Sequence, residues 1–394
     1  MKKLLIIGAS ILQLPAIRKA KEMGFEVAVA DFNPKAVGIP FADRYYNCST
    51  LDKEGILNVA REFCPDGIMT TATDMPMRVI AYVCSRMGLN GPSEECAFCC
   101  TDKVAMIKKF AEHGVPCPKF FEVKNSCELS KALDEMSYPC IMKPADNSGS
   151  RGVYLAKDRQ SAIDNYGYVT DSSRGGEILV EEYMAGPEVS VETFVCKGIA
   201  HVLQVTDKRT TGAPHFVETG HSQPSKLNPG TILRIKEVAQ KACNAVGLKD
   251  GPAHIEMIIT EQGPKMVEMG ARMGGDCITS HLVPLSTGID MVKQTILYSM
   301  GEEVDLTEKI NKGSAVRFIS AYKEGILTDI KGLESAKKIK GVQEIGFFKQ
   351  TGEKVGEVLS SSDRIGYVVA QADNADEAMK ICETAVKELT IYIE

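Results

Sequence analysis

The sequence has no apolar run that approaches the length needed to span a bilayer. It also has no basic tract, and its formal net charge is −6. This charge balance argues against a general nucleic-acid-binding protein. Apolar residues make up 44% of the chain and charged residues 25%, which is typical of globular domains. We therefore expect a soluble protein whose partners are small molecules, with no nucleic acid and no membrane among them.

The chain also lacks a convincing secretory signal. Its start, MKKLLIIGASILQLPAI, has only a short apolar run that leads into a glycine turn and a charged amphipathic helix, so we predict a first β-strand there. Without a secretory signal, the thirteen cysteines indicate reduced thiols and a cytoplasmic location. Cys96, Cys99 and Cys100 are close enough for a metal knuckle, but no second matching pair follows, so we do not expect zinc.

Two common nucleotide-binding motifs are missing as well. Gly8 stands alone without a G-x-G-x-x-G fingerprint, although Asp31 follows it at about the distance expected of a dinucleotide fold. This argues against NAD binding and against a dehydrogenase. The chain has no G-x-x-x-x-G-K-[ST] either, so any phosphate site is of another kind.

A chain of 394 residues is too long for one ordinary core, and two to four domains are expected. The first hundred residues alternate strands with helices, which predicts a parallel sheet with ligand-binding loops at the carboxyl ends of its strands. The predicted strands are KLLIIGAS, EVAVADFNP and GIMTTATD, with helices at about 14–23 and 53–63. Asp74, at the end of the third strand, either lines a substrate crevice or caps the helix that follows.

The most informative stretch is 251–275, GPAHIEMIITEQGPKMVEMGARMGG. It predicts two short strands joined by a turn at 261–264. Centring the hairpin on Gln262 places Glu256 directly opposite Glu268, with Met266 on the same face as Glu268. Two carboxylates that face each other across a ladder are unfavourable unless a positive charge lies between them.

Paired carboxylate oxygens suit Mg²⁺, which typically takes one or two carboxylates and completes its shell with substrate phosphates. Arg272, four residues after Glu268, would hold an anion beside the metal. The alternative is that both carboxylates point into solvent. The apolar setting, Arg272 and the Gly-Gly that follows favour a phosphoryl-transfer site.

Three earlier segments add phosphate and nucleotide signals. Lys103 lies in the first turn of a predicted helix, where the helix dipole favours acidic residues, so it indicates an anion partner unless it is simply a solvated surface lysine. Lys143 ends an apolar strand, and the glycine- and serine-rich loop 146–152 offers backbone N–H groups to phosphate, unless it is only a flexible hairpin loop. The run ILVEEYMAGPEVSVETFV predicts a strand, a bend that could read an adenine edge, and a second strand.

The order of these features resembles the ATP-grasp superfamily, from about residue 3 to residue 300. Within it the chain looks most like the L-amino-acid ligase branch, because of the predicted loop HFVETGHSQPSKL and the run EMGARMGGDCITSHLVPLSTG. It is also similar to phosphoribosylglycinamide synthetase and biotin carboxylase-type enzymes. The resemblance implies an α/β and α+β multidomain fold: an N-terminal parallel-sheet domain (1–100), an ATP-grasp domain (101–305, lid 117–182) and a C-terminal α+β cap (306–394).

The resemblance also implies roles for individual residues. Glu256 and Glu268 would bind Mg²⁺ or Mn²⁺, and Arg272 would stabilise the acyl phosphate and the tetrahedral oxyanion. Glu218 and His221 would face the substrates, with His221 orienting the amine or taking up its proton. The residues implied to bind ATP are Lys103, Lys143, Ser148, Gly149, Ser150, Arg151, Gly152, Glu181, Glu182, Met184 and Glu188.

One position departs from the pattern. Many ATP-grasp enzymes have Asn two residues after the second metal glutamate, and this chain has Gly270 there. A metal ligand is therefore missing or replaced by water, which leaves the number of Mg²⁺ ions open. In the C-terminal segment, Arg317 is the one residue that stands out as a candidate.

The resemblance implies ATP-dependent ligation of a carboxylate to an amine through an acyl phosphate. In the L-amino-acid ligase branch the two substrates would both be amino acids. The rival ligase is phosphoribosylglycinamide synthetase, for which we find no clear basic cluster to bind a ribose phosphate. A bicarbonate-activating enzyme ranks third. A catalytically inactive nucleotide-binding regulator is the alternative of another class. The resemblance implies a homodimer.

Overall fold

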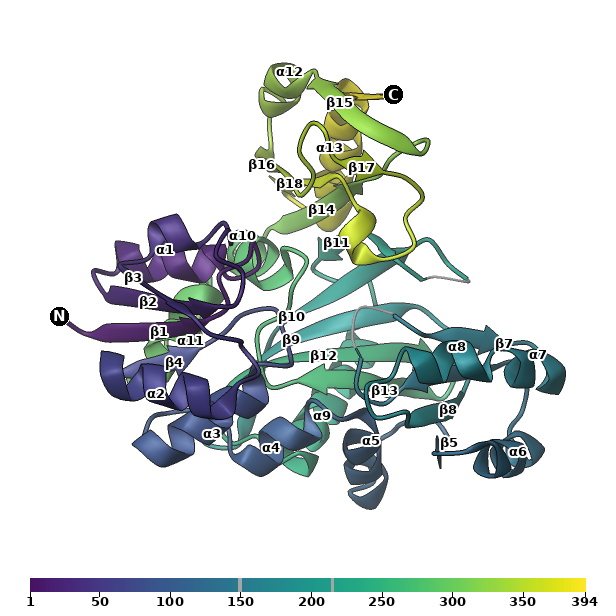
Figure 1. Ribbon diagram of the computed structural model, residues 1–394. Helices are drawn as coiled ribbons and strands as arrows, with labels where there is room; N and C mark the ends of the chain where they lie inside the picture. Colours follow the sequence, from purple (N-terminus) through teal and green to yellow (C-terminus); the bar gives the residue numbers. More distant parts are fainter. Residues whose placement is uncertain (148–150, 214–215) are drawn as a thin grey trace.

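The computed structural model describes residues 1–147, 151–213 and 216–394. Figure 1 shows three regions arranged around a central sheet: the N-terminal region at the left, the lid at the right and the C-terminal region at the top. In the described part of the chain, no helix has both the length and the apolar character required to cross a membrane.

The N-terminal region is built on a parallel four-stranded sheet in the order β3-β2-β1-β4. The parallel sheet and its three apolar strands were predicted correctly. The structure adds β3, a short edge strand of sequence RYYN that has no apolar run to reveal it. The elements are β1 (Lys3–Ile7), α1 (Leu14–Glu22), β2 (Glu26–Asp31), β3 (Arg44–Asn47), α2 (Lys53–Phe63), β4 (Gly67–Met69), α3 (Met77–Met87) and α4 (Glu94–Cys99), with a 3₁₀ turn at Ile39–Phe41.

The strand order of this sheet reverses between β1 and β4, since β2 and β3 lie on one side of β1 and β4 lies on the other. Ligands of open α/β sheets bind in the crevice outside the carboxyl ends of the strands at such a point. The loops that follow β1 and β4 therefore form the edge that the N-terminal region presents to the rest of the molecule.

The lid contains a second four-stranded sheet in the order β5-β8-β6-β7. Before the lid comes α5 (Lys103–Glu112), which Asp102 caps by accepting a hydrogen bond from the Ala105 N–H. The elements of the lid are β5 (Phe120–Val123), α6 (Ser126–Glu135), β6 (Cys140–Pro144), β7 (Tyr154–Ala156), α7 (Arg159–Asp164), α8 (Tyr166–Asp171) and β8 (Ile178–Glu182).

An eight-stranded antiparallel sheet forms the centre, in the order β13-β12-β9-β10-β11-β14-β18-β16. Its last three strands come from the C-terminal region, so one hydrogen-bonded ladder runs through both regions. The central elements are β9 (Glu188–Cys196), β10 (Ile199–Thr210), β11 (Glu218–Gln223), α9 (Pro229–Ala245), β12 (Gly251–Thr260), β13 (Gly263–Gly270), α10 (Val283–Thr287) and α11 (Met291–Ser299), with a π-helical turn at Ile278–Leu282.

The C-terminal region adds a three-stranded sheet in the order β17-β15-β19. Its long helix α13 packs on β14 and β18 and closes a separate hydrophobic core. The elements are β14 (Gly313–Ile319), β15 (Gly325–Lys331), α12 (Leu333–Lys337), β16 (Val342–Phe347), β17 (Lys354–Val355), β18 (Gly366–Ala372), α13 (Ala375–Glu388) and β19 (Thr390–Ile393), with a 3₁₀ turn at Ser361–Asp363.

The two faces of the central sheet have opposite character because side chains alternate along each strand. One face is apolar and packs with α9 in a large core that includes Val191, Val205, Ile255 and Met257. The other face carries polar residues at directly paired positions. We call this the polar face; its members include Glu188, Ser190, Glu192, Thr206, Lys208, His221, His254, Glu256 and Glu268.

Candidate active site

The β12–β13 hairpin brings the two predicted metal-binding carboxylates together. Glu256 pairs directly with Glu268, as the sequence predicted. The predicted four-residue turn is wrong, however, because Thr260 pairs with Gly263 and only two residues lie between them. The pairing register shifts at Val267, so this β-bulge compensates for the shorter turn and restores the opposition of the carboxylates.

The bulge also corrects the predicted face of Met266. This residue was placed beside Glu268 on one face, but it is buried in the apolar core on the other side of the sheet. An extra residue in the strand reverses the alternation, so Val267 and Glu268 both line the same cavity. The prediction had assumed unbroken alternation.

Two lysines neutralise the carboxylate pair. Lys103 forms an ion pair with Glu268. Lys208 forms ion pairs with Glu188 and with Glu256, the second at 3.0 Å. Burial would lower the pKa of Lys208, but the surrounding glutamates outweigh burial and raise its pKa. The positive charge that the sequence argument required is therefore present as two ammonium groups.

The sequence analysis did not identify Lys208. It is the middle residue of the polar run TDKRT in β10, where no motif surrounds it. Its side chain is only 3% exposed, and Glu218 lies 3.6 Å away as a third carboxylate neighbour. Lysine is almost never buried unless it is paired with an acidic group. The one sequence signal for Lys208 was therefore its place in a polar strand of an otherwise apolar sheet.

A buried histidine, also missed, lies behind Glu256. His254 Nδ1 is 2.6 Å from Glu192 Oε1, and its Nε2 is 3.3 Å from Glu256 Oε1. Burial would lower the pKa of His254, but Glu192 and Glu256 outweigh burial and raise it to about 9. The imidazolium links a fully buried glutamate to a predicted metal ligand and fixes the orientation of both.

This pKa predicts a pH-dependent stability for the nucleotide-free protein. Because the folded pKa lies above the unfolded value of 6.5, the contribution of His254 is complete below pH 6.5 and is lost between pH 6.5 and about 9. The shift corresponds to a contribution on the order of 3 kcal/mol. We expect the difference in Tm between wild type and His254→Gln to shrink over that pH range. The exposed-residue control His201→Gln should show no such trend, and a constant difference for His254→Gln would contradict the assignment.

Most residues predicted to bind ATP line one cavity between the lid and the central sheet. The predicted residues among its described lining are Lys103, Lys143, Arg151, Glu181, Glu182, Met184, Glu188, Glu218, Glu256 and Glu268. Lys208 and Asn147 line it as well. Gly152 and Arg272, also predicted, are not part of this lining.

The far end of the cavity holds a second buried ion pair. Lys143 Nζ lies 2.7 Å from Glu181 Oε2, and both side chains are almost fully buried. Within the described residues, Glu181 Oε1 has no hydrogen-bond partner. Glu182 instead accepts from Lys265 at 3.2 Å, and Met184, another residue of the cavity lining, is buried. A buried acceptor without a donor is what a ligand with an N–H group would satisfy.

The glycine-rich loop is described only at its two ends. Ser148, Gly149 and Ser150, predicted to close over phosphates, lie outside the described residues. At the near end, Asp146 accepts hydrogen bonds from the backbone N–H groups of Arg174 and Gly175 at 3.0 Å each. At the far end, Gly152 has φ +77, and a Cβ there would lie 2.3 Å from Ser172 Cβ, so this position requires glycine.

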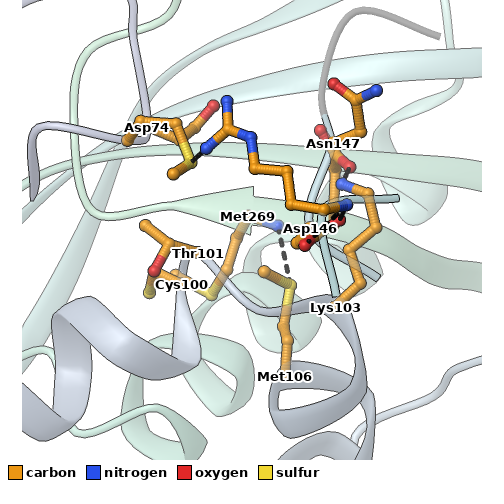
Figure 2. A pocket seen from close by; sticks show the side chains of 11 residues that line it. Asp74, Cys100, Thr101, Lys103, Met106, Asp146, Asn147 and Met269 are labelled. Carbon is orange, nitrogen blue, oxygen red and sulfur yellow. Dashed lines mark hydrogen bonds and ion pairs between the residues drawn. The ribbon is translucent and has the colours of Figure 1, made fainter. Parts of the chain in front are cut away.

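A smaller cavity adjoins the first and shares Lys103 and Glu268 with it. Figure 2 shows Lys103, Asp146 and Asn147 together on one side of this cavity and Asp74 on the other. The two sides belong to different regions, since Asp74 follows β4 of the N-terminal sheet. The predicted phosphate-binding residues therefore lie at the junction of the lid, the central sheet and the N-terminal region.

Arg272 is buried and paired with Asp74. Its Nε donates to Asp74 Oδ1 at 2.7 Å and its Nη2 to Asp74 Oδ2 at 2.8 Å. The carboxylate therefore does not cap α3; that helix has Pro76 at its cap position and no side-chain cap. Of the two roles considered for Asp74, the N-cap is wrong because the guanidinium takes both carboxylate oxygens.

Glu218 and His221 lie in strand β11, so the predicted loop around them is wrong. The polar run ETGHSQ forms a strand because it pairs with β10 on one side and β14 on the other. His221 is 1% exposed and was expected in a polar loop. Within the described residues neither ring nitrogen has a hydrogen-bond partner, although Nε2 lies 3.6 Å from Asp276 Oδ2. Glu218 lines the large cavity; His221 is not among its described lining residues.

Two C-terminal arginines lie near this strand. Arg317, noted in the sequence, donates to the Thr219 carbonyl at 2.8 Å. Arg364, not noted, forms a bidentate pair with Asp276 at 2.8 and 2.7 Å and lies over the Phe318 ring. The first contact joins the C-terminal region to strand β11, and the second joins it to the segment that follows β13.

The three cysteines considered as a metal knuckle are part of the hydrophobic core. Cys96, Cys99 and Cys100 lie with Cys243 in the apolar core behind the sheet. All thirteen cysteines belong to the described residues and all are free thiols. Among the described side chains, no group of three or more Cys, His, Asp or Glu residues is arranged to hold a metal ion.

The donor set does fit a Mg²⁺ ion that is shared with phosphates. Glu256 and Glu268 supply two carboxylates from paired positions. Both already form ion pairs with lysine ammonium groups, so their surroundings stabilise positive charge. Mg²⁺ typically takes one or two protein carboxylates together with substrate phosphates and water, so it does not need a cage of protein ligands.

Comparison with known proteins gives two family matches. Residues 136–280 match the family described as ATP-grasp domain, and residues 317–394 match L-amino acid ligase C-terminal domain 2. The L-arginine-specific L-amino acid ligase of Bacillus subtilis is 25% identical over 354 residues, which is 87% of this chain and 84% of that protein.

Two solved structures align over the whole chain. The L-amino acid ligase from Bacillus licheniformis superposes with a TM-score of 0.87 and 25% identity, covering 100% of this chain and 99% of the other. Phosphoribosylglycinamide synthetase from Anaerococcus prevotii gives a TM-score of 0.83 and 26% identity, with both chains covered completely. The similarity extends over every region described above.

Proposed function

Since the chain belongs to the ATP-grasp family, with the fold that its sequence predicted, we propose that it is a ligase that joins two amino acids. The observation that carries the proposal is the polar face itself. Glu256 and Glu268 oppose each other between Lys103 and Lys208, beside a buried arginine. The match of residues 317–394 to an L-amino acid ligase domain supports amino acids as the substrates.

In the proposed reaction, a substrate carboxylate attacks the γ-phosphorus of ATP and displaces ADP, giving an acyl phosphate. The amine of the second substrate then attacks the acyl carbon, loses a proton and releases inorganic phosphate. Little covalent chemistry falls to the protein, so its contribution is to align the reactants and to neutralise charge.

Each part of the site has a proposed task. Glu181, Glu182 and Met184 border the adenine, and Glu188 accepts from the ribose hydroxyls. Lys103 and Lys143 contact the phosphates, and the loop 146–152 covers them. When bound, Mg²⁺ or Mn²⁺ held by Glu256 and Glu268 would neutralise phosphate charge. Arg272 stabilises the charge that develops on the acyl group.

Lys208 has a consequence for this scheme. Its ammonium is held by Glu188, Glu218 and Glu256, which are assigned to the ribose, the substrate and the metal. One ammonium group therefore lies next to the carboxylates that are proposed to bind the ribose, the substrate and the metal ion. Glu218, at its side, is proposed to face the amine substrate together with His221, for which we propose uptake of the amine proton.

The experiment is phosphate release from ATP and Mg²⁺ against a panel of amino acids, singly and in pairs, with phosphoribosylamine plus glycine and bicarbonate as further arms. We expect release that requires one particular pair of amino acids, with formation of the dipeptide by mass spectrometry. Release without any acceptor pair, or with none of the pairs, would contradict the proposal.

The second candidate is phosphoribosylamine–glycine ligation, favoured by the whole-chain likeness to phosphoribosylglycinamide synthetase. It would show as release only in the arm with phosphoribosylamine and glycine. A regulator without catalysis would instead be stabilised by ATP and release no phosphate in any arm.

A homodimer in the cytoplasm remains our prediction for the assembly, and sedimentation equilibrium would test the dimer.

A further inference from the structure

The pairing of Arg272 with Asp74 connects two regions that are far apart in sequence. The residues are 198 positions apart, and their two parallel hydrogen bonds have the geometry of a bidentate guanidinium–carboxylate pair. Arg272 also donates from Nη1 to the Met273 carbonyl at 3.1 Å. A guanidinium has five N–H donors. Among the residues that the structure describes, these three bonds fix its plane and leave one N–H on each terminal nitrogen for a ligand.

The segment that carries Asp74 is itself held firmly. Gln13, buried in the loop after β1, donates to the Thr71 carbonyl at 2.7 Å, and the Thr71 hydroxyl donates back to the Leu12 carbonyl at 2.8 Å. Ala72 adopts φ 59, which is unusual for a residue with a side chain. The two loops at the switch point of the N-terminal sheet thus form one unit, from which the Asp74 carboxylate projects.

Gly270 gives an independent reason to see this pair as part of the site. A Cβ at position 270 would lie 2.6 Å from Asp74 Oδ1 and 3.0 Å from Arg272 Nε. Any side chain there would therefore displace the pair. The glycine that departs from the family pattern leaves the space into which the carboxylate of Asp74 reaches from the N-terminal region.

The charges agree with this geometry. Burial would raise the pKa of Asp74, but the Arg272 guanidinium outweighs burial and holds the pKa below its ordinary value. Lys103 adds to the same effect from the other side. Asp74 is therefore an anion at neutral pH and acts on Arg272 through a full charge.

We infer that Asp74 is a positioning residue: from the N-terminal region it orients the Arg272 guanidinium toward the transferring acyl group, in the space that Gly270 leaves open. The inference rests on the proposed function for the task of Arg272, and on the structure alone for the pair. It gives the N-terminal region a part in the chemical step, because its switch-point loops determine where the arginine points.

The main test compares Asp74→Asn with Gly270→Ala. Asn keeps the size of the side chain but loses the charge and one acceptor, and Ala at position 270 pushes against the pair without altering either partner. Since a misplacement of about 1 Å can cost about 10²-fold in rate, we expect both variants to lose about 10²-fold in kcat. The KM for ATP and the ATP affinity measured by calorimetry should stay within about threefold of wild type, because these variants leave the nucleotide-binding residues intact.

Two controls separate positioning from general damage. Lys19→Gln breaks the 3.1 Å pair with Asp290, another ion pair between the N-terminal region and the central part, and should leave kcat unchanged. The double variant Asp74→Asn/Arg272→Ala should be no slower than Arg272→Ala alone, because Asp74 acts through the arginine. Multiplicative losses in the double variant, or an unchanged kcat in both Asp74→Asn and Gly270→Ala, would overturn the inference.

A chemical readout tests the pair even if no amino-acid pair releases phosphate and the proposed function fails. Phenylglyoxal modifies arginine, and the extent of modification at each arginine is measured by peptide mass spectrometry. We expect Asp74→Asn to be modified faster than wild type at Arg272, with Arg364, which is held by Asp276, unchanged. An unchanged rate at Arg272 would show that Asp74 does not hold the guanidinium.

Discussion

Replacing Glu268 with Gln should leave less than about one per cent of wild-type turnover, as the loss of a major electrostatic contribution to a transition state does. Gln keeps the shape of the side chain but removes one of two carboxylates that face each other across the hairpin. It also leaves the Lys103 ammonium without its direct partner. Charge at the transferring phosphoryl group would then be poorly balanced.

The nucleotide should still bind to this variant, because the residues at the adenine end of the cavity are unchanged. Turnover is measured as phosphate release with the best amino-acid pair, and ATP affinity by calorimetry with and without Mg²⁺. Glu261→Gln, in the exposed turn of the same hairpin, is the matched control and should behave as wild type. Full activity of Glu268→Gln would remove the metal assignment.

Replacing Arg272 with Ala should lower kcat by at least about 10²-fold, in the range seen when one oxyanion donor is lost. The arginine is proposed to act on charge that develops during the reaction, so kcat and kcat/KM should fall together. The variant also leaves the Asp74 carboxylate buried without a partner, and a lower Tm is expected as a second effect.

A surface pair provides the control for this substitution. Arg209 pairs with Glu383 at 2.8 Å with both side chains largely exposed, so Arg209→Ala should change neither kcat nor Tm appreciably. If Arg272→Ala raised only the KM for ATP, the arginine would be a ground-state binding residue and its assignment to acyl transfer would be wrong.

The hairpin shows what local pattern can and cannot predict. Alternation and turn residues predicted the opposition of Glu256 and Glu268, which the structure has. The same reasoning gave the wrong turn and the wrong face for Met266, because a bulge at Val267 offset the error in turn length. A bulge depends on packing against neighbouring strands, and nothing local in KMVEMG indicates it.

The missed residues act through partners that are distant in sequence. Lys208 acquires its role from Glu188 and Glu256, and His254 from Glu192, each on another strand of the sheet. Asp74 was noticed, but its two possible roles could not be separated without knowing that Arg272 lies beside it. Residue type and spacing were enough to propose ligand-binding residues, whereas the charged partners that hold those side chains in place required the tertiary fold.

The continuous sheet limits which domains can replace the C-terminal region of such a chain during evolution. Strand β11 of the central part and β14 of the C-terminal region share a hydrogen-bonded ladder, from Gly220–Arg317 to Gln223–Ser314. A chain that ended before β14 would expose β11 as an unpaired edge, which is a ready template for aggregation. The C-terminal region can therefore be exchanged during evolution only for another segment that offers a strand to the same edge, which limits the domains that can stand in its place.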